Sequence, residues 1–157
     1  MASYKTTVRT DWSQEACFAY FAEFSNVADW DPSINAGRKL SGERDTPGAR
    51  WEVDVEMAGR EVTMPYETIE AVPPRKVVLR SEISALISVD TLTFDPAPGG
   101  GTAVTYDAQL TLKGALKLAD PLLQLGFKRT GDKARDGLEE KLAEPMPPIS
   151  TAESKSG

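Results

Sequence analysis

The acid–base chemistry open to this chain falls to carboxylates and tyrosines, because its 157 residues include no histidine. Histidine is the side chain that most often acts as a general base near neutral pH, and it is a common zinc ligand. Its absence excludes serine–histidine triads, cysteine–histidine nucleophile pairs and HExxH zinc proteases. We therefore expect no metal and no cofactor, and any proton transfer would use an Asp, Glu or Tyr that faces a bound molecule.

Asp90 lies in the predicted strand whose alternation of apolar residues is least regular. The apolar alternation runs through Ile87 and Val89, then changes parity and continues through Leu92 and Phe94. A change of parity within one strand predicts a β-bulge near Asp90, which would turn the carboxylate inward. Asp90 is thus a catalytic candidate, with a solvent-facing carboxylate as the alternative interpretation.

Tyr66 and Tyr106 are the other catalytic candidates, because both lie on the apolar side of predicted strands and carry a phenolic hydroxyl. The alternative is that each tyrosine supplies core area, with its hydroxyl bonded nearby. The carboxylates Glu52, Asp54 and Glu56 alternate with apolar residues and are predicted to face solvent. The sequence therefore names candidates for catalysis and assigns no catalytic residue.

The composition limits the compartment and the partners of the chain. Its net charge of -6 and pI near 4.8 argue against nucleic acid, because phosphate binding needs clustered Lys and Arg. The single cysteine, Cys17, excludes an internal disulfide, and no segment reaches the roughly 18 consecutive apolar residues of a membrane span. The first residues lack the pattern of a secretory signal, so a cytoplasmic location is expected.

The elements that must position the candidate residues follow from two periods in the sequence. Apolar residues at every second position predict seven strands, at about 4–10, 34–42, 51–57, 60–72, 76–83, 86–94 and 104–112. Helical spacing predicts a helix near 13–24 capped by Ser13, a short helix within 25–34, and a main helix over 121–143. Residues 144–157 have few apolar side chains and are predicted to be a disordered tail, which leaves one domain over 1–143.

Four segments of the chain occur in the same order in a known superfamily. They are Phe24-Ser-Asn-Val-Ala-Asp-Trp30-Asp-Pro32-Ser, Ala71-Val-Pro73-Pro74-Arg75, Gly100-Gly101-Thr102 and the terminal helix. With the order of the elements, they make 4–143 resemble the helix-grip fold of the SRPBCC superfamily, in particular its bacterial polyketide cyclase/dehydrase and lipid-transport-like members. The resemblance implies an α+β fold, in which a seven-stranded curved antiparallel sheet wraps around a long C-terminal helix, with two short helices between strands one and two.

The same resemblance implies that a small hydrophobic ligand, lipid or polyketide/aromatic-like, binds between the sheet and the terminal helix. The sequence agrees, because several side chains expected to face this space are small: Val53, Val55, Val62, Ala108 and Ala134. A gap lined by small apolar residues can hold a ligand. The alternative is a filled core, packed by larger residues: Trp51, Met57, Met64, Tyr66 and Phe127.

The predicted ligand-binding residues lie mainly on the apolar strand faces and on the helical stripe. They are Trp30, Trp51, Val53, Val55, Val62, Met64, Tyr66, Leu79, Ile87, Val89, Leu123, Phe127 and Thr130. Two other functions stay open: a cyclase/dehydratase-like enzyme, and a regulatory module that contacts a membrane or a protein. The second rests on 113–135, where six basic and two acidic residues give a net charge of +4.

Overall fold

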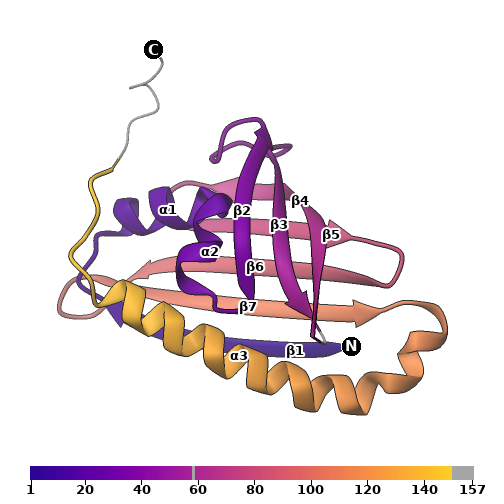
Figure 1. Cartoon of the computed structure of the whole chain (residues 1–157). Coiled ribbons are helices and arrows are strands. Elements are labelled where there is room, and N and C mark those ends of the chain that lie inside the picture. The colour runs from indigo at the N-terminus through magenta and orange to yellow at the C-terminus, as the bar shows by residue number, and fades with distance from the viewer. Residues whose placement is uncertain (58, 150–157) are drawn as a thin grey trace.

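The computed structural model describes residues 1–57 and 59–149, with the backbone alone for 119–122 (Figure 1). Its centre is a seven-stranded antiparallel sheet in the order β1-β7-β6-β5-β4-β3-β2. The strands are β1 (Ala2–Thr10), β2 (Ile34–Ser41), β3 (Arg50–Met57), β4 (Arg60–Val72), β5 (Lys76–Glu82), β6 (Leu86–Pro96) and β7 (Thr102–Leu112). The helices are α1 (Gln14–Ala22), η1 (Phe24–Asn26), α2 (Val27–Trp30), η2 (Gly114–Ala119) and α3 (Asp120–Leu142). The predicted α+β helix-grip arrangement is confirmed.

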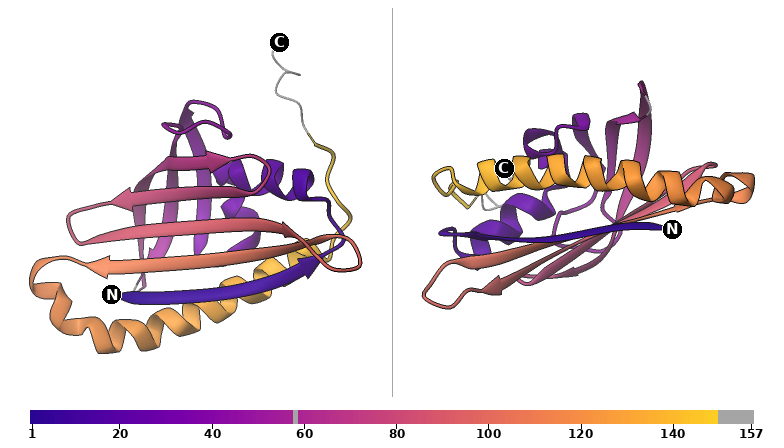
Figure 2. Two further views of the ribbon diagram at one scale, coloured as in Figure 1. Left: turned by 180° about the vertical axis from the view of Figure 1, so that it is seen from behind. Right: turned by 90° about the horizontal axis from the view of Figure 1, so that it is seen from below.

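The helices lie on one side of the sheet, as Figure 2 shows for α3 and the short helices. The chain begins at one edge with β1, crosses through α1, η1 and α2 to β2 at the other edge, and returns strand by strand to β7, which pairs with β1. α3 then packs along β1 and against α2. Because an antiparallel sheet commonly buries one face and exposes the other, the core and any cavity must lie on the helix side.

α1 begins where the sequence predicts it. The Ser13 hydroxyl accepts a hydrogen bond from the backbone N–H of Ala16 at 3.1 Å, and Glu15 lies in the first turn, where the helix dipole favours a negative charge. Cys17 faces the core, and burial raises the pKa of its thiol to about 12. A thiol with so high a pKa does not form the reactive thiolate near neutral pH, so Cys17 is a core residue.

Aromatic rings fill the core where α1 meets the end of α3. Trp12 and Phe21 have ring centroids 6.3 Å apart, and Phe21 also contacts Trp30 and Phe94 at 5.8 and 5.9 Å. The Trp12 indole N–H donates a hydrogen bond of 2.9 Å to the backbone oxygen of Glu144. Aromatic pairs contribute roughly 0.5–1.5 kcal/mol each beyond their buried area, and the hydrogen bonds of Trp12 to Glu144 and of Thr10 to Leu142 join this region to the end of α3.

The predicted disordered tail, 144–157, lies partly outside the described residues. Its described part, 144–149, has no regular secondary structure. Glu144 accepts the Trp12 hydrogen bond, and the backbone N–H of Ser13 donates to the Met146 sulfur at 3.4 Å. Disorder beyond residue 149 stays a prediction.

β6 corrects one sequence-based expectation. Its register with β5 and with β7 runs without a shift along the whole strand, so the bulge predicted near Asp90 is wrong. Ordinary alternation turns Asp90 inward, in phase with Leu92 and Phe94, and places Ile87 and Val89 on the opposite face. Register shifts occur instead in β2 and β4.

α3 is 23 residues long, or about 35 Å. Its fully packed side chains lie in its C-terminal half, where Ala134, Leu138 and Leu142 are buried at helical spacing. Among the described residues, no helix combines the length and the apolar character that a membrane span requires.

Gly137 marks the closest approach of α3 to α2. A β-carbon at Gly137 would collide with the backbone oxygen of Trp30 and lie 3.3 Å from the Cδ of Pro32. Gly126, in the same helix, has open space at the corresponding position. Because backbone atoms cannot yield as a flexible side chain can, the contact at residue 137 requires glycine.

We expect Gly137→Ala to lower the free energy of unfolding by about 1–3 kcal/mol, because α3 must move away from Trp30. Gly126→Ala is the matched control and should raise stability by up to about 1 kcal/mol, because alanine favours the helix. Urea unfolding followed by circular dichroism measures both. Equal midpoints for the two variants would contradict the close packing of α3 on α2.

Candidate functional site

A cavity of about 480 Å³ lies between the inner face of the sheet and the N-terminal half of α3. Its wall is mostly apolar and is built by η1, α2, α3 and the strands β2, β3, β4, β6 and β7. Representative side chains are Phe24, Val53, Met57, Leu112 and Phe127. The space predicted between the strands and the terminal helix is therefore present.

The strand alternation and the helical spacing in the sequence identified residues on opposite walls of this cavity. The predicted ligand-binding residues that line it come from β3, β4 and α3, and they are Val53, Val55, Met64, Tyr66, Leu123, Phe127 and Thr130. The strand residues share a face because successive side chains alternate across a sheet, and the helix residues share a face because they are three or four positions apart.

Four other predicted residues belong to the packed core and do not line the cavity. Trp51 is fully buried, and its indole N–H donates to the Thr68 hydroxyl at 3.0 Å. Trp30 belongs to the aromatic cluster beside α1, Leu79 is fully buried, and Val62 packs partly buried against the core. Periodicity gave the correct face for these side chains but could not separate core from cavity.

Ile87 and Val89 were predicted to line the cavity, and this is wrong. Both lie on the outer face of β6, because the strand has no bulge. The inner positions between Leu86 and Leu92 are taken by Ser88 and Asp90 instead.

A band of polar side chains crosses the inner face of the sheet, and we call it the polar band. It consists of Tyr66 on β4, Ser81 on β5, Ser88 and Asp90 on β6, and Tyr106 on β7. Ser81 lies opposite Ser88, and the Tyr66 O–H donates to the Ser88 hydroxyl at 3.2 Å. The Ser81 hydroxyl is buried without a hydrogen-bond partner among the described residues.

Asp90 is the central charged group of the polar band. Its side chain lines the cavity and is 8% exposed, and no described residue gives it a hydrogen bond or an ion pair. Burial, followed by the charges of Asp31 and Asp107, raises the pKa of its carboxyl to about 7. Near neutral pH Asp90 therefore exists in both protonated and ionised forms, which suits either proton transfer or a charged partner.

Asp31 is a second buried carboxyl in the cavity wall, at the C-terminal end of α2. Its Oδ1 accepts hydrogen bonds from the backbone N–H and the hydroxyl of Ser33, at 2.9 and 2.8 Å. Burial outweighs these bonds and raises the pKa of Asp31. Among the described residues, no group of three His, Cys, Asp or Glu side chains is placed to hold a metal ion.

Tyr66 and Tyr106 both line the cavity. Burial is the largest cause of the raised pKa of each phenol, and the charge of Asp90 adds to it. Both tyrosines therefore stay neutral and act as hydrogen-bonding groups. All three catalytic candidates from the sequence thus come together at one wall.

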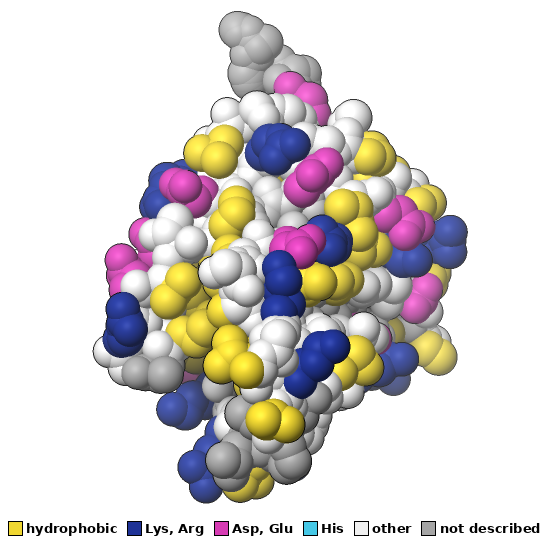
Figure 3. Space-filling view, turned by 90° about the vertical axis from the view of Figure 1, so that its right-hand side faces the viewer, with side chains coloured by type: hydrophobic (Ala, Val, Ile, Leu, Met, Phe, Trp, Pro, Cys, Tyr) yellow, Lys and Arg dark blue, Asp and Glu magenta, His cyan; other side chains and the backbone are white. Residues whose placement is uncertain are grey.

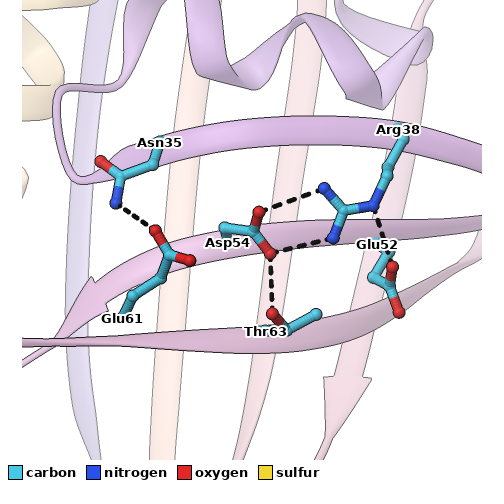
Figure 4. A network of polar contacts seen from close by, with 6 residues as sticks. All are labelled: Asn35, Arg38, Glu52, Asp54, Glu61 and Thr63. Atoms are coloured by element: carbon cyan, nitrogen blue, oxygen red, sulfur yellow. Dashed lines mark hydrogen bonds and ion pairs between the residues drawn. The ribbon is translucent and has the colours of Figure 1, made fainter.

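The carboxylates predicted to face solvent belong to a surface network on β2, β3 and β4 (Figure 4). Arg38 donates to both oxygens of Asp54, at 3.1 and 2.9 Å, and to Glu52 at 2.9 Å. Hydrogen bonds from Arg38 and Thr63 lower the pKa of Asp54. Glu56 is also exposed, although it borders the cavity at its mouth.

Sequence reasoning missed several cavity residues, above all Asp31, Ser33 and Ser88. Asp31 was predicted only as part of a segment with a short helix, 25–34, whereas its side chain lies in the cavity wall. A signal for Ser88 existed, because the inner positions of an unbulged β6 read Leu, Ser, Asp, Leu and Phe.

The surface near η2 carries exposed apolar and basic side chains. Leu118 is 89% exposed, Leu116 and Leu125 are about half exposed, and Lys117 lies between the first two. Figure 3 views the molecule from the side where η2 projects, and hydrophobic side chains lie there beside Lys and Arg. Membrane contact through 113–135 stays a prediction.

The raised pKa of Asp90 predicts that this residue lowers stability as pH rises. The folded protein holds the proton up to about pH 7, while the unfolded chain releases it near 3.8, so unfolding becomes easier between these values. We expect Asp90→Asn to raise the free energy of unfolding at pH 8, by at most about 4 kcal/mol, and to have no such effect at pH 4. Urea unfolding at both pH values measures the difference.

Asp95→Asn is the matched control, because Asp95 lies on the same strand and is exposed. Its stability should follow the wild-type pH dependence. An Asp90→Asn variant that is equally stabilised, or destabilised, at pH 4 and pH 8 would contradict the raised pKa.

Several solved structures share the fold. A START superfamily protein from Mycobacterium smegmatis has a TM-score of 0.74 at 16% identity, with 90% of this chain and 97% of that chain covered. A protein from Thermus thermophilus has a TM-score of 0.70 at 16% identity, with 90% and 95% covered. The di-domain ARO/CYC protein BexL from the BE-7585A biosynthetic pathway has a TM-score of 0.63 at 16% identity, with 92% and 50% covered.

At these identities the structural likeness shows the fold alone, and no curated protein sequence matches the chain. A family model described as polyketide cyclase / dehydrase and lipid transport matches residues 1–143. The matched residues include the whole sheet, the short helices and α3, and so the entire cavity. The chain therefore belongs to the polyketide cyclase / dehydrase and lipid transport family.

Proposed function

We propose that the protein binds one small hydrophobic molecule, a lipid or an aromatic polyketide-like compound, between the sheet and α3. The observation that carries this proposal is the apolar cavity of about 480 Å³ with a polar band on one wall. Ligand sites are typically concave, roughly 300–1,000 Å³ in volume and mostly apolar, with a few polar groups that fix orientation. The family description, which names polyketide cyclases and lipid transport, supports the same class of ligand.

A filled core is the alternative, and the packing argues against it. Well-packed interiors contain few voids larger than a water molecule. Trp51 is fully buried in the core, but the space under the N-terminal half of α3 is bordered by small residues, such as Val55 and Ala108, opposite Phe127. These side chains are too short to close the space from the sheet side.

We expect N-phenyl-1-naphthylamine, an uncharged fluorescent probe, to bind the wild-type protein saturably with one site. Val55→Trp should abolish this binding and change the free energy of unfolding by less than about 1 kcal/mol, because the indole enters open space. Fluorescence titration and urea unfolding measure the two effects.

Val89→Trp is the matched control, since it makes the same change on the outer face of β6. It should leave probe binding intact. The proposal fails if the wild type does not bind the probe and Val55→Trp destabilises by about 1–3 kcal/mol, the strain expected in a packed core.

A second candidate function is catalysis of the cyclase or dehydratase type, and the inward position of Asp90 favours it. A carboxyl with a pKa of about 7 can donate its proton to a carbonyl or departing hydroxyl oxygen near neutral pH. The neutral hydroxyls of Tyr66 and Tyr106 can hold that oxygen in place.

If the protein is an enzyme of this kind, Asp90→Asn should lower kcat on small aromatic polyketide substrates by about a hundredfold or more. The wild-type rate should also fall as pH rises through about 7, because the acid loses its proton. Asp95→Asn serves as the control and should keep the wild-type rate. Turnover that survives in Asp90→Asn would exclude this role.

A further inference from the structure

The cavity presents more hydrogen-bond acceptors than donors. Both oxygens of Asp90 lack a partner among the described residues, and Asp31 uses Oδ1 to accept both bonds from Ser33. In the described part of the polar band, the hydroxyl hydrogens of Ser81, Ser88 and Tyr106 lack an acceptor, and of these three residues Ser88 and Tyr106 line the cavity. A ligand head group that fits this wall must therefore donate hydrogen bonds.

Within the part of the chain that the structure describes, no Lys or Arg in the cavity wall balances the two buried carboxyls. To this wall α3 contributes Leu123, Gly126, Phe127 and Thr130. An ionised carboxylate buried without a counter-charge is strongly disfavoured, which is why the pKa of Asp90 is raised. A positive charge on the ligand would remove this penalty.

Aromatic rings line the same part of the cavity. The ring centroids of Phe24 and Tyr66 are 4.9 Å apart. Tyr106 lies on β7, which pairs with β6, the strand that carries Asp90. The faces of aromatic rings attract cations, most strongly where water is excluded. These rings would support an ammonium group and would give no such advantage to an anion.

We propose that the ligand of this cavity carries a protonated amine, which donates to Asp90 beside Tyr66 and Tyr106 while its apolar body lies under Leu123 and Phe127. This inference rests on the proposed hydrophobic-ligand function and names the polar end of that ligand. An ammonium group has donors and no acceptor, so it complements the wall, whereas a carboxylate or phosphate head group would meet two like charges.

Three probes of similar shape test the inference, and they differ in the charge of the head group: the cation of 2-(1-naphthyl)ethylamine, the neutral 2-(1-naphthyl)ethanol and the anion 1-naphthaleneacetate. Each is titrated by calorimetry at pH 8. We expect the amine to bind at least about tenfold more tightly than the alcohol, because a charge-assisted hydrogen bond replaces a neutral one. The acetate should bind most weakly. In Asp90→Asn the amine should lose its advantage to within about threefold of the alcohol, whose own affinity should not change and so reports an intact cavity.

Asp107→Asn is the matched control, because it removes a nearby negative charge from the other face of β7. It should keep the preference for the amine. This separates a direct contact with Asp90 from a general change in charge.

The pH dependence gives an independent readout on the wild-type protein. Amine affinity should rise about tenfold from pH 6 to pH 8, because Asp90 ionises near pH 7 while the amine stays protonated. The other titratable groups facing Asp90 are Asp31 from α2, Glu56 from β3, and the neutral phenols of Tyr66 and Tyr106. In Asp90→Asn the rise should disappear.

The amine inference is overturned if the amine binds no more tightly than the alcohol, if its advantage survives in Asp90→Asn, or if the alcohol binds more tightly at pH 6 than at pH 8. The last result would show that protonated Asp90 donates to a neutral ligand. If N-phenyl-1-naphthylamine binds but the amine has no advantage, only this inference fails. If no probe binds, the proposed ligand-binding function fails with it.

Discussion

The structure depends on the close packing of the C-terminal half of α3 against α2 and the sheet. Leu138 and Leu142 are buried there, and Gly137 brings the helix against the backbone of Trp30. The N-terminal half of α3 is held by exposed hydrogen bonds between Gln124 and the backbone of Ser3, but it has no buried side chain among the described residues. The small side chains beneath it do not reach across. The contact that fixes the helix at one end therefore also determines where the interior stays open. The C-terminal half of α3 stabilises the fold, and the N-terminal half of the same helix borders the cavity.

The polar band lowers the stability of the fold near neutral pH. Burial of Asp90 without a described partner opposes ionisation, and so near neutral pH this wall is less favourable than an apolar one would be. Sequences that keep such a group usually do so at functional positions, where local rules of packing are broken for a purpose. The outer carboxylates show the contrast, because Asp54 is fully satisfied by Arg38 and Thr63 and serves the surface.

The fold followed from the sequence because its signals are local. Alternation identified each strand, and Ser13 marked the start of α1. The site was only partly predictable, because tertiary packing decides which side chains line the cavity, and no local sequence pattern encodes that packing. Ile87 and Val89 were placed inside on the rule that apolar residues face the core, yet a sheet face toward solvent still accepts apolar side chains. Asp31 lies in the wall through tertiary packing, since α2, which ends beside it, packs against β2 and α3.

The continuous register of β6 separates two sets of inward side chains along one strand. Along one inner face, Leu92 and Phe94 build the core, whereas Ser88 and Asp90 determine the chemistry of the wall. The two sets occupy separate positions of a single unbulged strand, so a substitution at Ser88 or Asp90 changes the polar groups of the wall and leaves the core positions Leu92 and Phe94 as they are. The chemistry of the wall and the packing of the strand therefore depend on different residues.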